Sequence, residues 1–329
     1  MVQSLKKERV VILYQKVPAN ALADEKDTLV QKDFVKSQLI SLGYEVRELA
    51  VDLNLKKLSL RLSRIRPQLV FNLVESLNGK GQLINLTAQL LESLGIPYTG
   101  AQAESLFLTS NKLLTKKLLK LNGIPTPAFA PAHATPSAIK KLGFPLLLKR
   151  IWEHASLGLD EKAFVREENA LPDTSTFPPD SYFERYIEGR EFNVALLERD
   201  GRPQPLPVAE IMFIDYPACK PKIVDYKAKW EPNSFDYQHT PPVYEFESRD
   251  QKLLARLKQL SLQCWKLFGL KGYARVDFRV DEAGNPFVLE INANPCLAPE
   301  AGFMRAALKG GYKAQEIIQA ILLACGKSV

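Results

Sequence analysis

The residues best suited to chemistry gather near the C-terminus, between Gly272 and Pro295. Asp277 and Glu290 supply carboxylates and Asn292 supplies an amide oxygen, in a stretch without cysteine or histidine. Such a donor set suits a hard cation, and magnesium, which also binds nucleotide phosphates, is the usual choice. The stretch therefore predicts a magnesium site, and the alternative is a surface hairpin whose outer face is merely charged.

Two strands and a turn would bring these side chains together. Residues 273–280 alternate between apolar and polar side chains, which is typical of a half-buried strand. Residues 286–292 repeat the alternation, with Phe287, Leu289 and Ile291 on the expected apolar face. A hairpin closed at 283–284 would place Asp277 opposite Glu290. Arg275 would share their face and could neutralise a phosphoryl group during its transfer.

The bulk properties of the 329-residue chain indicate a reduced, cytoplasmic protein with two or three domains. No run of about 18 apolar residues predicts a membrane span, and the N-terminus lacks the apolar segment of a signal peptide. The cysteines at 219, 264, 296 and 325 are scattered and lack CxxC spacing. Neither a zinc knuckle nor a disulfide framework is therefore expected.

The net charge of +7 fits either a nucleic-acid binder or an enzyme that gathers lysines around a nucleotide. The lysines are spread through the chain, and no aromatic–basic motif accompanies them. We therefore expect no nucleic-acid partner.

The first 105 residues alternate between expected strands and expected helices. Strands are predicted at 9–13, 45–49 and 69–73, separated by helical patterns. This rhythm is typical of an open parallel α/β sheet. We therefore expect a first domain that ends near residue 105.

The remaining chain mixes strands, helices and loops. A lysine-rich helix is expected at 111–121, a strand at 146–150, and a strand, turn and strand around 188–189. The segment after residue 150 could cover a phosphate with its backbone N–H groups. Because it contains only Gly158, a plain hairpin loop remains equally open.

Six pieces of the sequence carry a resemblance that covers nearly the whole chain. They are Leu94-Gly-Ile-Pro-Tyr-Thr-Gly, Asn111-Lys112 with Gly123-Ile-Pro-Thr-Pro, Gly143-Phe-Pro-Leu-Leu-Leu-Lys149, Glu184-Arg-Tyr-Ile-Glu-Gly-Arg-Glu191, Ala228-Lys229-Trp230, and the hairpin from Ala274 to Pro295. In this order they resemble the D-alanine–D-alanine ligase family of ATP-grasp enzymes.

The resemblance implies an α/β protein with the ATP-grasp fold. An N-terminal open parallel α/β domain (1–105) would precede a central ATP-grasp subdomain (106–188). A C-terminal ATP-grasp subdomain with the magnesium site (189–329) would complete the clamp around the nucleotide. A homodimer formed through the first domain is also implied.

The resemblance also assigns roles around ATP. Lys112 and Lys149 would bind phosphate oxygens as point charges. The backbone of Arg185 and Ile187 would pair with adenine, and Glu191 would accept from the ribose hydroxyls. Further contacts would come from Ser156, Glu184 and Lys229, the last clamping the γ-phosphate from a lid.

The implied reaction is an ADP-forming ligation of a carboxylate to an amine through an acyl phosphate. Asp277, Glu290 and Asn292 would hold two magnesium ions, for which manganese may substitute. Arg275 and Lys229 would be catalytic.

The expected substrate half differs from the family pattern. Glu25, Asn294 and Cys296 would lie there, but Cys296 replaces a glycine of the family. Ala155 stands in place of a serine and Trp230 in place of a lid tyrosine, and Trp230 cannot accept a hydrogen bond. We therefore expect small amino-acid-like substrates other than two D-alanines.

Three alternatives stay open. The chain could be a non-catalytic ATP-binding scaffold or regulator, although such a protein has little need of the whole acidic hairpin. An acceptor with a thiol or hydroxyl could replace the amine. Cys296 could be a nucleophile, but no histidine or acid accompanies it in a recognisable arrangement, which favours a small apolar wall residue.

Overall fold

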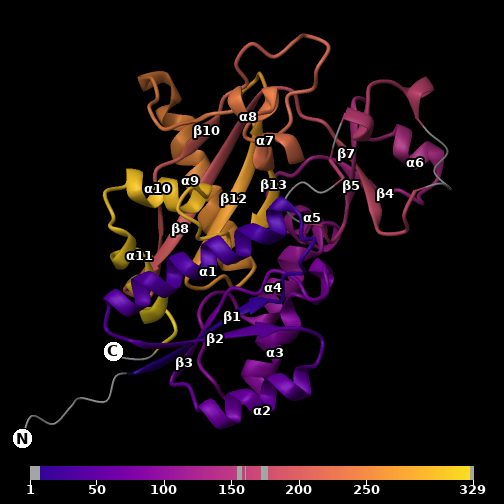
Figure 1. The fold of residues 1–329 in the computed structure, drawn as a ribbon. Helices are drawn as coiled ribbons and strands as arrows, with labels where there is room; N and C mark the ends of the chain where they lie inside the picture. Colours follow the sequence, from indigo (N-terminus) through magenta and orange to yellow (C-terminus); the bar gives the residue numbers. More distant parts are fainter. Residues whose placement is uncertain (1–7, 154–157, 160, 172–176, 327–329) are drawn as a thin grey trace, which may run out of the picture.

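Three sheets organise the chain in the computed structural model, which describes residues 8–153, 158–159, 161–171 and 177–326 (Figure 1). The first sheet has the order β2-β1-β3, and β1 pairs with both neighbours in parallel. The prediction of a parallel α/β sheet is therefore confirmed. Its elements are β1 (Arg9–Gln15), α1 (Ala23–Ser41), β2 (Glu45–Val51), α2 (Leu55–Ile65), β3 (Leu69–Asn72), the 3-10 turn η1 (Gly81–Leu83) and α3 (Asn85–Ser93).

Two helices, α4 (Ala103–Ser110) and α5 (Lys112–Leu121), lead from this sheet into the rest of the chain. The lysine-rich pattern predicted α5, whereas α4 was not expected from the sequence. Leu106 of α4 and Leu119 of α5 pack in one core with Val276 of the largest sheet and Ala88 of α3. This core therefore contains residues from both sides of position 105, where the first domain was expected to end. The expected domain limits remain predictions.

The second sheet is small and antiparallel, with the order β4-β7-β5-β6. It encloses a core that includes Ile139, Leu146 and Phe183. Its elements are β4 (Phe129–Pro131), α6 (Pro136–Lys140), β5 (Leu146–Arg150), η2 (Glu161–Ala163), β6 (Phe164–Val165), η3 (Glu168–Ala170) and β7 (Ser181–Arg185).

The third sheet is antiparallel, with the order β11-β10-β8-β12-β13 and with β9 paired to β8. Its strands are β8 (Arg190–Arg199), β9 (Arg202–Pro205), β10 (Ala209–Ile211), β11 (Pro242–Val243), β12 (Tyr273–Val280) and β13 (Pro286–Asn292). Its helices are α7 (Tyr226–Trp230), α8 (Phe235–Gln238), η5 (Ser248–Asp250), α9 (Gln251–Leu267), α10 (Gly302–Lys309) and α11 (Ala314–Leu323). In the described part of the chain, no helix has the length and apolarity that crossing a bilayer requires.

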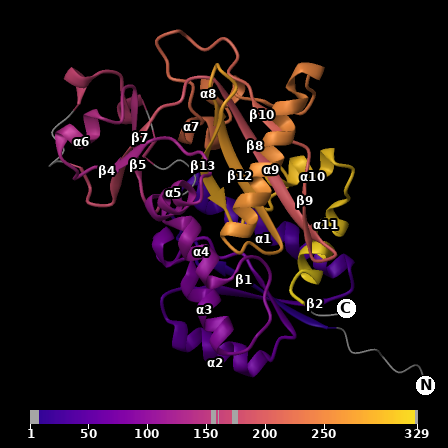
Figure 2. The same cartoon turned by 180° about the vertical axis from the view of Figure 1, so that it is seen from behind.

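Helices cover both faces of the third sheet. Val194 and Leu196 of β8 pack with α9, whereas Ala195 and Leu197 pack with α10 and α11 on the other face. The two views show this arrangement, with α1 in front of the sheet in Figure 1 and α9 in front of it in Figure 2. The strand that carries the predicted site is thus held rigidly between two helical layers.

The hairpin of β12 and β13 places Asp277 directly opposite Glu290, as predicted. The pairing register shifts after Asp277, because Phe278 pairs with Val288 and leaves Leu289 as an extra residue. The expected apolar face of β13 was therefore wrong in two positions, Leu289 and Phe287, because Phe287 pairs with Arg279 and shares its face. Val288 is buried in the core, whereas Leu289 is only half-buried and lines a pocket.

Candidate active site

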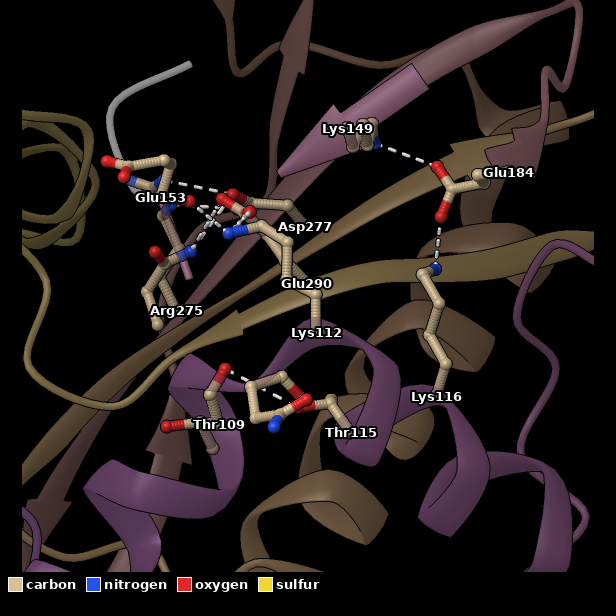
Figure 3. Close-up of polar contacts among 12 residues, drawn as sticks. Thr109, Lys112, Thr115, Lys116, Lys149, Glu153, Glu184, Arg275, Asp277 and Glu290 are labelled. Carbon is tan, nitrogen blue, oxygen red and sulfur yellow. Dashed lines mark hydrogen bonds and ion pairs between the residues drawn. The ribbon is translucent and has the colours of Figure 1, made fainter. Parts of the chain in front are cut away.

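Asp277 is the centre of a polar cluster on the hairpin (Figure 3). The guanidinium of Arg275 donates to both of its carboxylate oxygens, at 2.7 and 2.9 Å. Asn193 of β8 donates to it at 2.8 Å, and Asn292 of β13 donates to it at 3.1 Å. Four side chains from three neighbouring strands therefore converge on one face of the sheet.

Glu290 lies among cations. Lys112, at the start of α5, places its Nζ 3.7 Å from Oε2 of Glu290 and also bonds the carbonyl of Glu153. Burial alone would raise the pKa of the Glu290 carboxyl, but Lys112, Lys229 and other nearby cations hold it well below its usual range. Glu290 is therefore an anion over the whole physiological pH range.

The residues present fit magnesium. Two carboxylates and an amide are hard oxygen donors, and magnesium is commonly held by one or two carboxylates together with substrate phosphates. Asn292 turns its Nδ2 toward Asp277 and Glu290, so a half-turn of its amide would present oxygen to the same space. Within the described residues, no group of three or more His, Cys, Asp and Glu side chains could hold a metal by itself. Phosphate oxygens would complete the set.

A buried ion triad lies beside this cluster. Figure 3 shows Glu184 of β7 between Lys149 of β5 and Lys116 of α5. Lys149 pairs with Glu184 at 2.8 Å, and Lys116 pairs with its other carboxylate oxygen. Burial alone would raise the pKa of Glu184, but the two lysines keep it below its ordinary value. Lys149 was predicted to bind phosphate. In this structure its ammonium group pairs with the carboxylate of Glu184.

A pocket lies between the second and third sheets, and its space, open solvent included, amounts to about 860 Å³. Among the residues that line it are all but one of the predicted nucleotide contacts and both carboxylates: Lys112, Lys149, Glu184, Arg185, Ile187, Glu191, Lys229, Asp277 and Glu290. The exception, Ser156, lies outside the described residues, as does Ala155. We call this space the nucleotide-side pocket.

A wider cleft adjoins it and reaches α1 and the segment after β3. Glu25, Asn294 and Cys296, the predicted substrate residues, all line this cleft. Two of them accept backbone hydrogen bonds. Glu25 caps α1 through the N–H of Leu22, and Asn294 accepts from the N–H of Ala101, which is distant in sequence. We call this space the substrate cleft.

The thiol of Cys296 donates to Oδ2 of Asp27 at 3.0 Å. Burial, together with the carboxylates of Glu75 and Asp27, raises the pKa of Cys296 well above its usual value. A thiol that keeps its proton is a poor nucleophile. Cys296 is therefore a wall residue, and the nucleophile alternative is not supported.

The two spaces meet at the acidic hairpin. Asp277, Glu290, Lys229 and Glu191 line both the nucleotide-side pocket and the substrate cleft. A phosphoryl group that leaves a nucleotide in the first space would therefore enter the second space beside Arg275, which lines the cleft. The arrangement suits phosphoryl transfer between two bound molecules.

Sequence reasoning missed several residues of this region. They are Lys116 in the ion triad, Arg279 in the nucleotide-side pocket, and the pair Asp24 and Tyr226 at the cleft. Arg279 belongs to the alternating pattern of β12, which was the one signal that could have found it.

The comparison with known sequences decides the family. The sequence model described as "D-ala D-ala ligase C-terminus" matches residues 118–323. The chain belongs to the D-alanine–D-alanine ligase family. The sequence-based resemblance is thereby confirmed.

Curated relatives agree with this assignment. The D-alanine–D-alanine ligase of Moorella thermoacetica is 30% identical over 302 residues, which cover 88% of this chain and 91% of that protein. An uncharacterized protein, y4sG, of Sinorhizobium fredii is 32% identical over 257 residues, which cover 77% of this chain and 73% of that protein.

Solved members of the D-alanine–D-alanine ligase family share the fold. The enzyme from Bacillus anthracis complexed with ATP superposes with a TM-score of 0.73 at 21% identity, over 97% of this chain and 96% of that one. D-alanyl-alanine synthetase A from Vibrio cholerae superposes with a TM-score of 0.75 at 17% identity, over 98% of this chain and 100% of that one. These likenesses show the fold, so the predicted ATP-grasp class is confirmed.

Proposed function

We propose that this chain is an ATP-dependent, ADP-forming ligase that joins the carboxylate of one small amino-acid-like molecule to the amine of another. The observation that carries the proposal is the meeting of the nucleotide-side pocket and the substrate cleft at Asp277, Glu290 and Lys229. Family membership supports the same conclusion.

The nucleotide would lie along the nucleotide-side pocket. Arg185 and Ile187 line that space and would bind adenine through their backbone, while Glu191 would accept from the ribose. Lys112 and Lys149 would bind the phosphates. Lys149 is held in position for this by Glu184.

Asp277, Glu290 and Asn292 would hold the magnesium. When bound, magnesium would neutralise phosphate charge and lower the cost of moving a phosphoryl group. Arg275 already binds Asp277 with two hydrogen bonds, which fixes its guanidinium at the end of the hairpin. From there its charge would stabilise the phosphoryl group in transfer.

The chemistry follows from the poor reactivity of a carboxylate. A carboxylate oxygen of the first substrate would attack the γ-phosphorus of ATP, and the bond to the bridging oxygen would break to release ADP. The amine nitrogen of the second substrate would then attack the acyl carbon. Phosphate would leave with the electron pair of the C–O bond, and the nitrogen would lose a proton. The walls of the cleft must exclude water, because water would hydrolyse the acyl phosphate.

The substrates are proposed to differ from two D-alanines. Trp230 and Cys296, which depart from the family pattern, both line the substrate cleft. Glu75, which belongs to the segment Val74-Glu75-Ser76 that replaces a His-Gly motif of the family, lines it as well and lies near Asp27. These changes alter the charge and hydrogen bonding of the walls that would contact the amino acids.

The test is phosphate release from ATP and magnesium, screened against single and paired D- and L-amino acids with mass detection of products. A product with the mass of two substrates minus water would establish the ligase and identify both halves. A pair of D-alanines as the best substrate would contradict the proposed change of specificity. ATP binding without stimulation by any pair would favour the non-catalytic scaffold.

A further inference from the structure

Arg279 is a buried arginine at the nucleoside end of β12. Arg275, Asp277 and Arg279 alternate along this strand and therefore share one face, at a spacing of about 6–7 Å between successive members. Arg275 lines the substrate cleft, whereas Arg279 is 3% exposed and lines the nucleotide-side pocket. The strand thus presents a charged series that runs from the reacting end to the nucleoside end of the site.

The guanidinium of Arg279 joins three walls of the nucleotide-side pocket. Its Nε donates to the carbonyl of Ile187 at 3.0 Å, and its Nη2 donates to the hydroxyl of Tyr186 at 3.2 Å. Its Nη1 donates to the carbonyl of Lys222 at 3.0 Å. Ile187 and Tyr186 form the expected adenine hinge, and Lys222 precedes the lid helix α7. Only a planar fork with five N–H donors can serve acceptors spread in this way.

Arg279 also holds the carboxylate expected at the ribose. Glu191 lies directly opposite it on β8, and Nη1 lies 3.3 Å from Oε2 of Glu191. The glutamate side chain is only 12% exposed. Burial raises the pKa of Glu191, and the charge of Arg279 opposes that rise. One oxygen of Glu191 is therefore occupied by Arg279, which leaves Oε1 as the acceptor for a ligand.

We propose that Arg279 is a positioning residue that sets the selectivity of this site for the ribose of the nucleotide. It would act through Glu191, whose free oxygen it aims at a ribose hydroxyl, and through the hinge carbonyl of Ile187. The inference rests on the proposed function, because it takes the nucleotide-side pocket as the ATP site. If Arg279 is replaced, the affinity for ATP and the preference for ATP over deoxynucleotides should both fall.

The experiment measures binding of ATP, 2′-deoxyATP and 3′-deoxyATP to the full chain by calorimetry, with magnesium and without amino acids. The wild-type protein is expected to bind ATP at least five-fold more tightly than one of the two deoxynucleotides. Arg279→Met is expected to weaken ATP binding by about ten-fold or more and to reduce that preference to less than two-fold. Glu191→Gln should reduce the preference similarly, and the double variant should discriminate no less than either single variant.

Arg190→Met is the matched control. Arg190 lies on neighbouring β8, stacks on Phe192 and binds two carboxylates, of Glu210 and Asp250, but lines neither the nucleotide-side pocket nor the substrate cleft. Its loss should lower stability and leave the ratio of ATP to deoxynucleotide affinities unchanged. A purely structural role of Arg279 would give the same result as this control.

The outcomes separate the two proposals. A folded Arg279→Met variant with the wild-type ratio would overturn the role of Arg279 and leave the ligase proposal intact. If the wild-type protein bound no ATP, both would fail. Should Arg279→Met not fold, Arg279→Lys decides the matter. Lysine keeps the charge but cannot donate to all four acceptors. The ratio of ATP to deoxynucleotide affinity should therefore fall at least two-fold in this variant, and an unchanged ratio would overturn the proposal.

Discussion

The hydroxyl of Tyr226 donates a hydrogen bond to Oδ1 of Asp24 at 3.1 Å, across 202 residues of sequence. Tyr226 begins α7, which also carries Lys229, and Asp24 lies in the first turn of α1. Asp24 and Lys229 both line the substrate cleft. The bond therefore connects the expected lid helix with α1 beside the substrate cleft.

Tyr226→Phe should loosen this closure without changing the shape of the side chain. One hydrogen bond contributes about 0.5–1.5 kcal/mol, so a two- to ten-fold rise in the fraction of open lid is expected. Water would then reach the activated substrate more often. The ratio of ADP released to product ligated should rise above one, as measured by parallel assays of both.

Asp24→Ala, which removes the acceptor, provides the companion variant, and the double variant should be no worse than the worse single variant. Additive effects would show that the two side chains act separately. A ratio that stays at one in Tyr226→Phe would remove the lid interpretation.

Glu290→Gln should abolish turnover while leaving the fold intact. The substitution removes a carboxylate that is opposite Asp277 and that Lys112 and other cations keep ionised. The loss in kcat should be on the order of 100-fold or more, since a preorganised charge at the reacting centre is removed. Activity would be followed as ADP release over a magnesium titration.

Asp281→Asn is the control for this variant, because Asp281 is a carboxylate in the turn of the same hairpin and binds Asn285. It should retain activity. Full activity of Glu290→Gln at saturating magnesium would refute the metal assignment.

Lys116→Met should lower stability. The Lys116 side chain is fully buried against Glu184, which is 1% exposed, and also bonds Thr126 at 3.0 Å. Removing one partner of a buried pair costs about 3–5 kcal/mol, and the lower end applies here because Lys149 still compensates Glu184. The free energy of unfolding would be measured with a denaturant.

Lys117→Met is the control, because Lys117 is the neighbouring lysine on the same helix and is exposed. It should change stability by less than about 0.5 kcal/mol. Equal effects of the two substitutions would mean that the buried pair contributes no more than an exposed lysine.

The hairpin could be predicted from the sequence because a strand has a period of two, which puts Asp277 and Glu290 on one face once the turn is placed. The bulge at Leu289 could not, because an extra residue in a strand changes the pairing without a distinct local composition. The α/β alternation of the first 105 residues was likewise readable, whereas α4 was missed because three of its buried residues, Ser105, Thr109 and Ser110, are polar and interrupt the apolar pattern.

Long-range partners limit prediction of the site more than local structure does. Lys116 is one of four lysines in α5, and nothing nearby in sequence marks it as the one that meets Glu184. Arg279 was placed on the correct face by the alternation, but its acceptors come from the hinge and from the segment before α7. Such contacts depend on how distant elements pack, which one sequence does not reveal.

The pH dependence of stability should carry the signature of Glu75. Burial, together with the carboxylates of Asp27 and Asp24, raises the pKa of Glu75 to about 7, although Gln31 donates a hydrogen bond to it. The folded state therefore keeps a proton that the unfolded state loses above its ordinary value of 4.5. Stability must fall as pH rises between these two values and level off above the higher one.

The measurement compares the wild-type protein with Glu75→Gln, which can still accept from Gln31 but does not titrate. The free energy of unfolding of the variant, minus that of the wild-type protein, should grow from pH 5 to pH 8 by at most about 3 kcal/mol, since each pKa unit corresponds to 1.36 kcal/mol. Glu104→Gln, on an exposed position of α4, should show no such trend. If this difference in unfolding free energy stays constant or shrinks with rising pH, Glu75 is ionised in the folded protein at pH 5. Groups other than a proton would then compensate the neighbouring carboxylates of Glu75, Asp27 and Asp24.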